Sequence, residues 1–362
     1  MPSKVLLAMS GGVDSSVCAR LLKDQGHEVL GVFMRTGVHS HAENAPERKK
    51  GCCSAVDAAD ARRVADRMDI PFYALDFEAE FGKIMDYFAT EYLSGRTPNP
   101  CVVCNNWLKF GQLWTYGKKL GVDYIATGHY ARVIPHTDGA QLHRAFDRQK
   151  DQTYVLHGLK QEILNHIIFP LGEMQKEDVR QLASDAGLAV ANKPDSVEIC
   201  FVPDQDHARM VRERMPGKSK PGVIRDTSGK ILGPHDGIER FTVGQRKGLN
   251  VAAGERRYVL EILPDSAEVI VGDKEGLLAK GLAASGMNWL CNAQPGETIE
   301  GQAQIRYRHQ AAQATVKCLP DGEAYFRFEE PQSAITPGQA VVLYQGERVL
   351  GGGWINEATE PA

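Results

Sequence analysis

The sequence predicts an α/β protein in which a parallel sheet with flanking helices is followed by a small central domain and a C-terminal β-barrel. Three observations predict this order. Up to about residue 190, short apolar runs alternate with segments of helical periodicity. From about residue 205, the chain is rich in Gly- and Pro-containing turn dipeptides. After residue 280, short strand-like segments recur with turns between them.

The sheet domain is predicted element by element from local pattern. Residues 13–25 place Val13, Val17, Leu21 and Leu22 at helical spacing, and Gly26 follows where a helix would end. Residues 5–9 form an apolar run of strand length. The full prediction is strands over 5–9, 29–34, 71–75 and 124–127, with helices over 13–25, 54–68, 81–93, 107–120 and 176–186. Such alternation favours a parallel sheet with helices on both faces.

The same patterns set the predicted domain limits. We expect the sheet domain over residues 1–205, the central domain over 206–278 and the barrel over 279–362. The central domain carries short strands over 257–263 and 268–271. The barrel strands are predicted over 299–307, 313–319, 324–328, 340–344 and 349–355.

Composition excludes several classes of protein. The chain has 362 residues, 43% of them hydrophobic and 24% charged, which is ordinary for a globular protein of two or three domains. It has no run of about 18 apolar residues that would span a membrane, and the apolar run at 5–9 is too short for a signal peptide. We therefore predict a cytoplasmic protein. The net charge of −4 does not exclude nucleic acid, because phosphate binding needs only a local positive face.

A glycine- and serine-rich turn, Ser10-Gly11-Gly12-Val13-Asp14-Ser15-Ser16, joins the first predicted strand to the first helix. Two glycines allow a tight turn and close approach of a ligand, and the amide groups at the helix start point toward an anion. Asp14 would repel a phosphate unless it holds Mg²⁺ between itself and a polyphosphate. The turn lacks the Gly-Lys-Ser/Thr of a Walker A loop and does not match the dinucleotide fingerprint. The alternative is that this turn binds no ligand and is an ordinary strand–turn–helix connection.

Eight cysteines in a long chain without a signal peptide do not suggest a set of disulfides. Cys18, Cys291 and Cys318 are interpreted as small buried hydrophobic residues. The adjacent pair Cys52-Cys53 follows a polar loop over 39–50 and is interpreted as structural, with an exposed redox-active pair as the alternative.

Cys101 and Cys104 are interpreted together. Asn99 suits a helix cap and Pro100 a first helical position, so both thiols would lie one turn apart near a helix N-terminus, which favours thiolate. Half of a zinc site and simple burial remain alternatives, although no second Cys-x-x-Cys or His pair completes four ligands. In residues 196–202 an alternating pattern would point Cys200 away from the apolar side. Sulfur chemistry with a persulfide and a resolving thiolate is favoured.

With these residues in hand, the chain resembles the bacterial and mitochondrial tRNA-specific 2-thiouridylases, which belong to the N-type ATP pyrophosphatases. The resemblance spans nearly the whole chain. It lies in Ser10–Ser16, Thr97-Pro98-Asn99-Pro100 with Cys104-Asn105, Thr127-Gly128-His129-Tyr130, Lys150-Asp151-Gln152-Thr153-Tyr154, residues 197–201 and residues 241–249.

The resemblance implies an adenine nucleotide α-hydrolase-like domain that adenylates the C2 oxygen of the wobble uridine in certain tRNAs and replaces it with sulfur. Cys104 would be the nucleophile and Cys200 the persulfide carrier, and the two could form a disulfide when sulfur leaves. ATP would bind at Ala8, Met9, Ser10, Gly11, Gly12, Val13, Asp14, Ser15, Met34 and Gly128. tRNA would contact Asn99, Pro100, Cys101, His129, Lys150, Asp151, Gln152, Arg306, Tyr307 and Gln339. A persulfide-donor protein and a monomeric enzyme are expected.

Position 101 departs from the family pattern, in which many members carry Asp. Cys101, Cys104 and Cys200 could therefore hold a [4Fe–4S] cluster, as related thiolation enzymes do, instead of using a persulfide alone. Two other functions compete. A synthetase or amidotransferase acting on a small molecule would explain the Ser10–Ser16 turn, but not Cys104 with Cys200. A tRNA-binding module without catalysis would not need the intact Asp14 and glycines.

Overall fold

The computed structural model describes residues 2–38, 55–195, 199–251 and 256–361. The predicted loop over 39–50 and the pair Cys52-Cys53 lie outside these residues, as do positions 196–198. The chain forms two compact units. The first contains Met1–Ile84, Cys101–Gln205 and Glu347–Val349, and the second contains Met85–Pro100, Asp206–Gly346 and Leu350–Ala362. Within the described residues, no helix has both the length and the apolarity needed to cross a bilayer.

The core of the first unit is a five-stranded parallel sheet with the order β3-β2-β1-β4-β7. Its strands are β1 (Lys4–Ala8), β2 (Glu28–Arg35), β3 (Phe72–Asp76), β4 (Tyr124–Ala126) and β7 (Ile167–Ile168). The inner residues of β1 are fully buried, as expected of a strand covered on both faces. Strand order reverses beside β1, because the chain runs from β1 to β2 on one side and returns at β4 on the other. Ligands bind at such a reversal, beyond the carboxyl ends of the strands.

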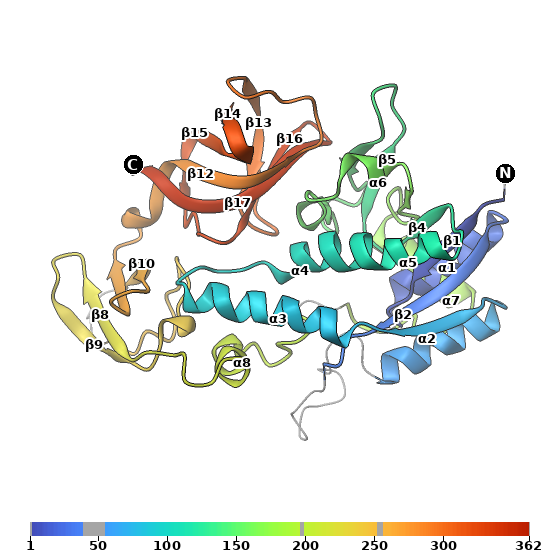
Figure 1. Cartoon of the computed structure of the whole chain (residues 1–362), viewed down its shortest axis with the longest axis horizontal. Helices are drawn as coiled ribbons and strands as arrows, with labels where there is room; N and C mark the ends of the chain where they lie inside the picture. Colours follow the sequence, from blue (N-terminus) through green and yellow to red (C-terminus); the bar gives the residue numbers. More distant parts are fainter. Residues whose placement is uncertain (1, 39–54, 196–198, 252–255, 362) are drawn as a thin grey trace. The chain divides into compact units, whose positions relative to one another are not determined.

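Helices α1 (Val13–Asp24), α2 (Ala55–Arg67) and α7 (Lys176–Asp185) pack together against this sheet (Figure 1). Their apolar positions share one core with the sheet, including Val5, Leu7, Val17, Leu22, Val64 and Val179. The unit also contains the hairpin of β5 (Ala131–Ile134) and β6 (Gln141–Arg144), the short helices η3 (Thr153–Val155) and α6 (Gln161–Leu164), and the start of α3 (Glu78–Leu93). The predicted parallel-sheet domain is confirmed.

One long helical run carries the two paired cysteines. It consists of α4 (Pro100–Val103), the π-helix η2 (Cys104–Leu113) and α5 (Trp114–Lys119). Val103 and Trp114 keep right-handed helical angles, so the run is continuous. Pro100 is its first residue, as predicted, but the helix expected over 107–120 begins seven residues earlier because the Cys-x-x-Cys segment is itself helical.

The second unit contains a four-stranded sheet and a barrel. The sheet has the order β10-β11-β8-β9 and consists of β8 (Gly222–Asp226), β9 (Ile231–His235), β10 (Tyr258–Leu263) and β11 (Glu268–Gly272). Ile224, Val259, Val269 and Val271 form its core. Helix α8 (His207–Arg214) and the short helices η4 (Ile238–Arg240) and η5 (Glu275–Leu277) accompany it.

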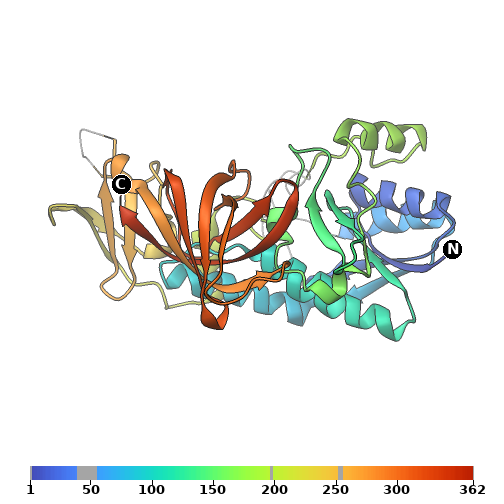
Figure 2. The same ribbon diagram turned by 90° about the horizontal axis from the view of Figure 1, so that it is seen from above.

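The predicted C-terminal β-barrel is confirmed (Figure 2). Strands β12 (Leu278–Trp289), β15 (Ala324–Ser333), β14 (Ala312–Cys318), β13 (Thr298–Gln304), β16 (Ala340–Gln345) and β17 (Arg348–Pro361) follow one another, and β17 pairs with β12 to close the barrel. The short helix η6 (Pro320–Gly322) joins β14 to β15. Alternate residues of β14 are buried, which is the pattern of a strand with one face on the core.

Two expectations about strand ends and buried cysteines were wrong. The strand expected over 299–307 ends at Gln304, because Arg308 has a positive φ of 61° and the His309 amide donates to the Arg306 carbonyl to close a turn. Arg306 and Tyr307 therefore lie in a turn. Cys291 is half-buried against the barrel core instead of fully buried, whereas Cys18 and Cys318 are buried as predicted.

Candidate functional site

The turn between β1 and α1 has the geometry of an anion cradle. Gly11 has a φ of +73°, and Gly12 is the extended residue that caps α1. The Ser15 and Ser16 hydroxyls both donate to the Gly12 carbonyl, at 3.2 and 2.8 Å. The Ser10 amide donates to the Ser15 hydroxyl at 3.2 Å. These local bonds hold the turn in shape and direct the N-terminus of α1 toward the carboxyl end of the sheet.

Close packing around this turn explains why glycine stands at two positions. A Cβ on Gly11 would lie well inside 3.0 Å of the backbone carbonyl of Asp57 in α2. A Cβ on Gly128, just beyond β4, would lie 3.1 Å from the Ser15 amide nitrogen. Segments from β1, α2 and β4 therefore meet at the turn. Met34 lies half-buried near the end of β2, opposite Leu75.

Asp14 occupies the first turn of α1 and holds two partners from distant segments. Lys176 Nζ lies 2.7 and 2.8 Å from the two carboxylate oxygens, and the Tyr130 hydroxyl donates to the carboxylate at 2.9 Å. Burial, followed by the charge of Asp14, raises the pKa of Tyr130, so its hydroxyl stays a donor. Lys176 also lies over the Tyr130 ring, 5.6 Å from its centroid.

Asp195 links the Asp14–Lys176 pair to the segment that leads toward Cys200. Its carboxylate lies 2.9 Å from Lys176, 2.9 Å from Lys150 and 2.8 Å from Arg180. Burial alone would raise the pKa of Asp195, but hydrogen bonds from Lys150 and Lys176 outweigh it and hold the pKa at about 2. Lys176 is fixed in turn, because its amide donates to the Asp147 carboxylate at 3.0 Å.

Lys193 makes a second attachment on the other side of the turn. Its ammonium group lies 2.9 Å from the Gly11 carbonyl oxygen, 2.6 Å from Asp57 and 2.8 Å from Asp60. Burial alone would lower the pKa of Lys193, but hydrogen bonds to Asp57 and Asp60 raise it. Residues 193–195 are therefore tied to the turn through Lys193 and to Asp14 through Asp195 and Lys176.

The low pKa of Asp195 predicts a pH-dependent contribution to stability. Its folded pKa lies below the ordinary value of 3.8, so the carboxylate stabilises the fold above about pH 4 and loses this effect as the pH falls toward 2. Because 27% of the side chain is exposed, we expect about 1 kcal/mol. Urea unfolding of the wild type and Asp195→Asn, followed by Trp fluorescence, should show a stability difference at pH 5 that shrinks by pH 3. A difference independent of pH would contradict this.

The structure places the predicted sulfur-handling residues as follows. Cys101 is exposed and Cys104 half-buried, one in α4 and the other at the first position of η2. Asn105 is buried, and its amide donates to the Val155 carbonyl at 3.0 Å, which fixes the helix beside Cys104. π-Helical segments are frequent at functional sites.

The extended alternation expected around Cys200 was wrong in the part that the structure describes. Ile199–Val202 form a turn in which the Val202 amide donates to the Ile199 carbonyl at 2.9 Å. Phe201 packs edge-on against Phe81, with ring centroids 5.7 Å apart, and this contact holds the turn. Cys200 is half-buried within it.

Metal binding by the cysteines finds no support in the arrangement of donors. Among the described residues, no three side chains of His, Cys, Asp or Glu gather closely enough to hold a metal ion. Cys101, Cys104 and Cys200, all described, do not form such a group. The three thiols as arranged therefore do not fit a [4Fe–4S] cluster.

Several residues that were predicted to contact tRNA make hydrogen bonds within the protein in this structure. His129 is buried and hydrogen-bonded to Thr127 at 2.7 Å, and burial, then the charge of Lys109, holds its pKa well below the usual value. Asp151 accepts hydrogen bonds from Arg144 and Thr153, and Gln152 accepts one from the Tyr130 amide. These side chains brace the loop that presents Lys150.

In the second unit, Gln339 braces the segment before Pro100. Its side-chain amide donates to the carbonyls of Thr97 and Pro98, at 3.0 and 3.3 Å, and the Thr97 amide donates to the Pro337 carbonyl at 2.8 Å. Pro98 and Pro100 are buried and Asn99 is half-buried. Gln339 therefore holds the segment that carries Asn99 and Pro100.

The other two predicted contacts of the second unit lie on the turn after β13. The Arg306 guanidinium donates to the Ser333 carbonyl at 2.9 Å. Tyr307 is 40% exposed and lies beside the Arg308 guanidinium, 5.6 Å from its ring centroid. An exposed ring beside a guanidinium group suits a base or a phosphate.

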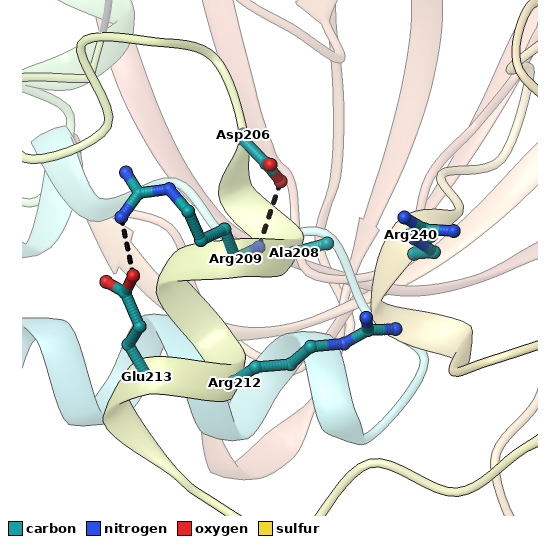
Figure 3. A pocket seen from close by; sticks show the side chains of 6 residues that line it. All are labelled: Asp206, Ala208, Arg209, Arg212, Glu213 and Arg240. Carbon is teal, nitrogen blue, oxygen red and sulfur yellow. Dashed lines mark hydrogen bonds and ion pairs between the residues drawn. The ribbon is translucent and has the colours of Figure 1, made fainter. Parts of the chain in front are cut away.

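A depression of about 410 Å³ lies on α8, lined by Asp206, Ala208, Arg209, Arg212, Glu213 and Arg240 (Figure 3). Arg209 pairs with Glu213 at 2.7 Å, and Asp206 accepts from the Arg209 amide at the helix start. Arg212 pairs with the buried Glu239 at 2.7 Å. These arginines have acidic partners within the unit, so the side chains that line the depression mainly form ion pairs with neighbouring residues.

Comparison with known proteins agrees with this geometry. Family models described as tRNA methyl transferase HUP domain, tRNA methyl transferase PRC-barrel domain and aminomethyltransferase β-barrel domain match residues 3–204, 210–273 and 279–355. A tRNA-specific 2-thiouridylase of Carboxydothermus hydrogenoformans is 49% identical over 98% of both chains. Another, of Rhodopirellula baltica, is 46% identical over 99% of this chain and 97% of that one.

The chain belongs to the tRNA-specific 2-thiouridylase family. Among solved structures, this 2-thiouridylase family member is similar to an NMN synthetase from Francisella tularensis, with a TM-score of 0.33 and 14% identity over 58% of this chain and 76% of that one. It is also similar to a 4-thiouridine synthetase–RNA complex with bound ATP, with a TM-score of 0.36 and 14% identity over 60% and 51% of the two chains.

Sequence reasoning missed Lys176, Lys193 and Asp195. Lys176 is the first residue of a predicted helix, where the positive end of the helix dipole is unfavourable for a cation. This unusual position was the sequence signal that could have drawn attention to it. A buried lysine at that position needs a carboxylate partner, but the sequence does not say which one.

Proposed function

We propose that the protein is an ATP-dependent tRNA-uridine 2-sulfurtransferase that acts on the wobble uridine. The observation that carries this proposal is the close meeting of β1, α2 and β4 around Asp14, in a chain that is 49% identical to a 2-thiouridylase. The two halves of the proposal are adenylation at the Ser10–Ser16 turn and sulfur transfer through Cys104 and Cys200.

Adenylation makes the uridine oxygen able to leave. The C2 oxygen attacks the α-phosphorus of ATP, and pyrophosphate departs toward the amides at the start of α1. In this proposal Ala8, Met9, Met34 and Gly128 surround the adenosine, and Ser10–Ser15 surround the phosphates. A base in an anticodon loop leaves its stack at lower cost in free energy than a base in a duplex. The uracil can therefore enter the protein, where its C2 atom reacts.

Sulfur transfer then needs two thiols. The terminal sulfur of a Cys200 persulfide attacks C2, and AMP leaves with the former C2 oxygen. The Cys104 thiolate attacks Sγ of Cys200, which releases 2-thiouridine and leaves a Cys104–Cys200 disulfide. A thiol reductant restores both thiols, and a persulfide-donor protein reloads Cys200. Cys101, one turn before Cys104, replaces a frequent family Asp and would face the base together with Asn99 and Pro100.

Mg²⁺ fits Asp14 by the chemistry of its donors, because a carboxylate beside a phosphate cradle is the usual protein contribution to a magnesium–nucleotide site. When bound, the ion would neutralise polyphosphate charge. A [4Fe–4S] cluster is not part of the proposal, because Cys101, Cys104 and Cys200 do not gather as three metal donors. We also propose a monomeric cytoplasmic enzyme with domains over residues 1–205, 206–278 and 279–362.

The test is product formation in unmodified tRNA. The full chain with ATP, Mg²⁺ and a persulfide donor should convert the wobble uridine to 2-thiouridine, detected by nucleoside mass spectrometry, with one pyrophosphate released for each sulfur inserted. Omission of ATP should abolish the product. Pyrophosphate release that depends on a small carboxylate and not on tRNA would identify a synthetase instead.

A further inference from the structure

Lys176 is buried between two carboxylates that belong to different parts of the first unit. Only 8% of its side chain is exposed, and its ammonium group lies within 2.9 Å of oxygens from both Asp14 and Asp195. Its backbone amide donates to Asp147, and the bonds to the two carboxylates hold the ammonium group away from solvent. The nearest partners of the ammonium group are therefore these two carboxylates, with the Tyr130 ring 5.6 Å away.

Nucleotide binding changes one of these partners. A divalent cation on the Asp14 carboxylate would bring its charge next to the Lys176 ammonium, which lies 2.7 and 2.8 Å from the two carboxylate oxygens. Like charges at such separations repel strongly when they are shielded from water. Lys176 then needs another anion within reach of the Ser10–Ser16 turn, and the incoming polyphosphate is that anion.

We propose that Lys176 is a phosphate-binding residue that exchanges Asp14 for the polyphosphate of ATP while it keeps its ion pair with Asp195. This inference rests on the proposed function for the nature of the ligand. In the nucleotide-free enzyme, Lys176 neutralises Asp14 and so preserves the turn. In the complex, the same ammonium group neutralises the phosphates and connects them to residues 193–195.

The geometry gives Lys193 a different role, so a Lys193 variant is a matched control for the Lys176 variant. Lys193 is also held by two carboxylates, those of Asp57 and Asp60, but its third contact is the Gly11 carbonyl and not Asp14. It supports the backbone of the turn. Loss of Lys193 should therefore weaken the binding of AMP as well as that of ATP, because the turn surrounds the α-phosphate that both nucleotides carry.

The experiment measures binding of α,β-methylene-ATP with Mg²⁺, and of AMP, to the full chain by calorimetry without tRNA. Lys176→Met should weaken binding of the ATP analogue by about 10- to 100-fold and that of AMP by less than about threefold. Lys193→Met should weaken the binding of AMP as well as that of the ATP analogue. Lys176→Arg should recover part of the ATP-analogue affinity.

Equal losses for the two nucleotides in Lys176→Met, or no loss for either, would overturn the proposal and leave Lys176 a structural counter-ion. Urea unfolding of each variant shows whether it folds. Lys176→Gln, which can still hydrogen-bond to both carboxylates, serves if Lys176→Met does not fold. A wild-type protein that binds the ATP analogue but forms no 2-thiouridine would contradict the proposed function without affecting this result.

Discussion

Replacement of Cys200 by Ser should abolish 2-thiouridine formation, with a loss of at least about 10³-fold in turnover, while adenylation persists. A hydroxyl group cannot carry a persulfide, so sulfur never reaches C2. Activation of the C2 oxygen needs only ATP and the bound base, and tRNA-dependent exchange of labelled pyrophosphate into ATP should remain. Both rates should be measured on the same preparation.

Cys104→Ser should separate the attack of the persulfide on C2 from the release of 2-thiouridine. The persulfide on Cys200 can still attack C2, but the adduct has no thiolate to resolve it, and tRNA should accumulate as a covalent complex visible on a gel without reductant. Cys291→Ser is the control, because this residue is half-buried against the barrel core. Multiple turnover by Cys200→Ser would show that sulfur enters by another route.

Replacement of Gly11 by Ala should be the most damaging single methyl addition in the Ser10–Ser16 turn. The left-handed φ of +73° costs an alanine about 1 kcal/mol, and the new Cβ would overlap the Asp57 carbonyl, which belongs to the backbone and cannot move aside easily. We expect a loss of about 2–4 kcal/mol in the free energy of unfolding and an ATP affinity at least about 100-fold weaker. Urea unfolding and calorimetry measure these two quantities.

Gly26 provides a matched control for this substitution. It has a similar φ of +82°, but a Cβ there would meet no atom within 4 Å. Gly26→Ala should therefore carry the conformational cost of about 1 kcal/mol and leave ATP binding unchanged. If the two alanine variants behaved alike, the close approach of α2 to the turn would have no importance for the nucleotide site.

Much of the sheet domain could be predicted because its central strands β1 and β2 are largely buried and leave a continuous apolar signal. The Ser10–Ser16 turn was found for the same reason, since it stands directly after such a strand. β12 was missed because its residues, LAKGLAASGMNW, are poor in β-branched side chains. Its strand conformation comes from pairing with β15 and β17.

The charged part of the site was not predictable in the same way. Lys176 and Asp14 are 162 residues apart, and Lys150 and Asp195 are 45 apart. Local pattern says only that each is polar. The choice of partner depends on the sheet order that brings α1 and α7 together. A single sequence does not show that these two helices are close in space. The turn at Ile199–Val202 likewise follows from a contact with Phe81.

The hydrogen bonds from Gln339 to Thr97 and Pro98 join positions more than 240 residues apart. During synthesis the ribosome completes the segment before Pro100 long before it reaches Gln339. Until then that segment is held by local contacts such as the ion pair of Arg96 with Glu91, without the hydrogen bonds from Gln339. Domains generally fold as units while the chain emerges, but this segment must wait for the last barrel strands. The order of translation thus delays the final placement of Asn99 and Pro100 until the chain is nearly complete, and a prematurely terminated chain would lack it.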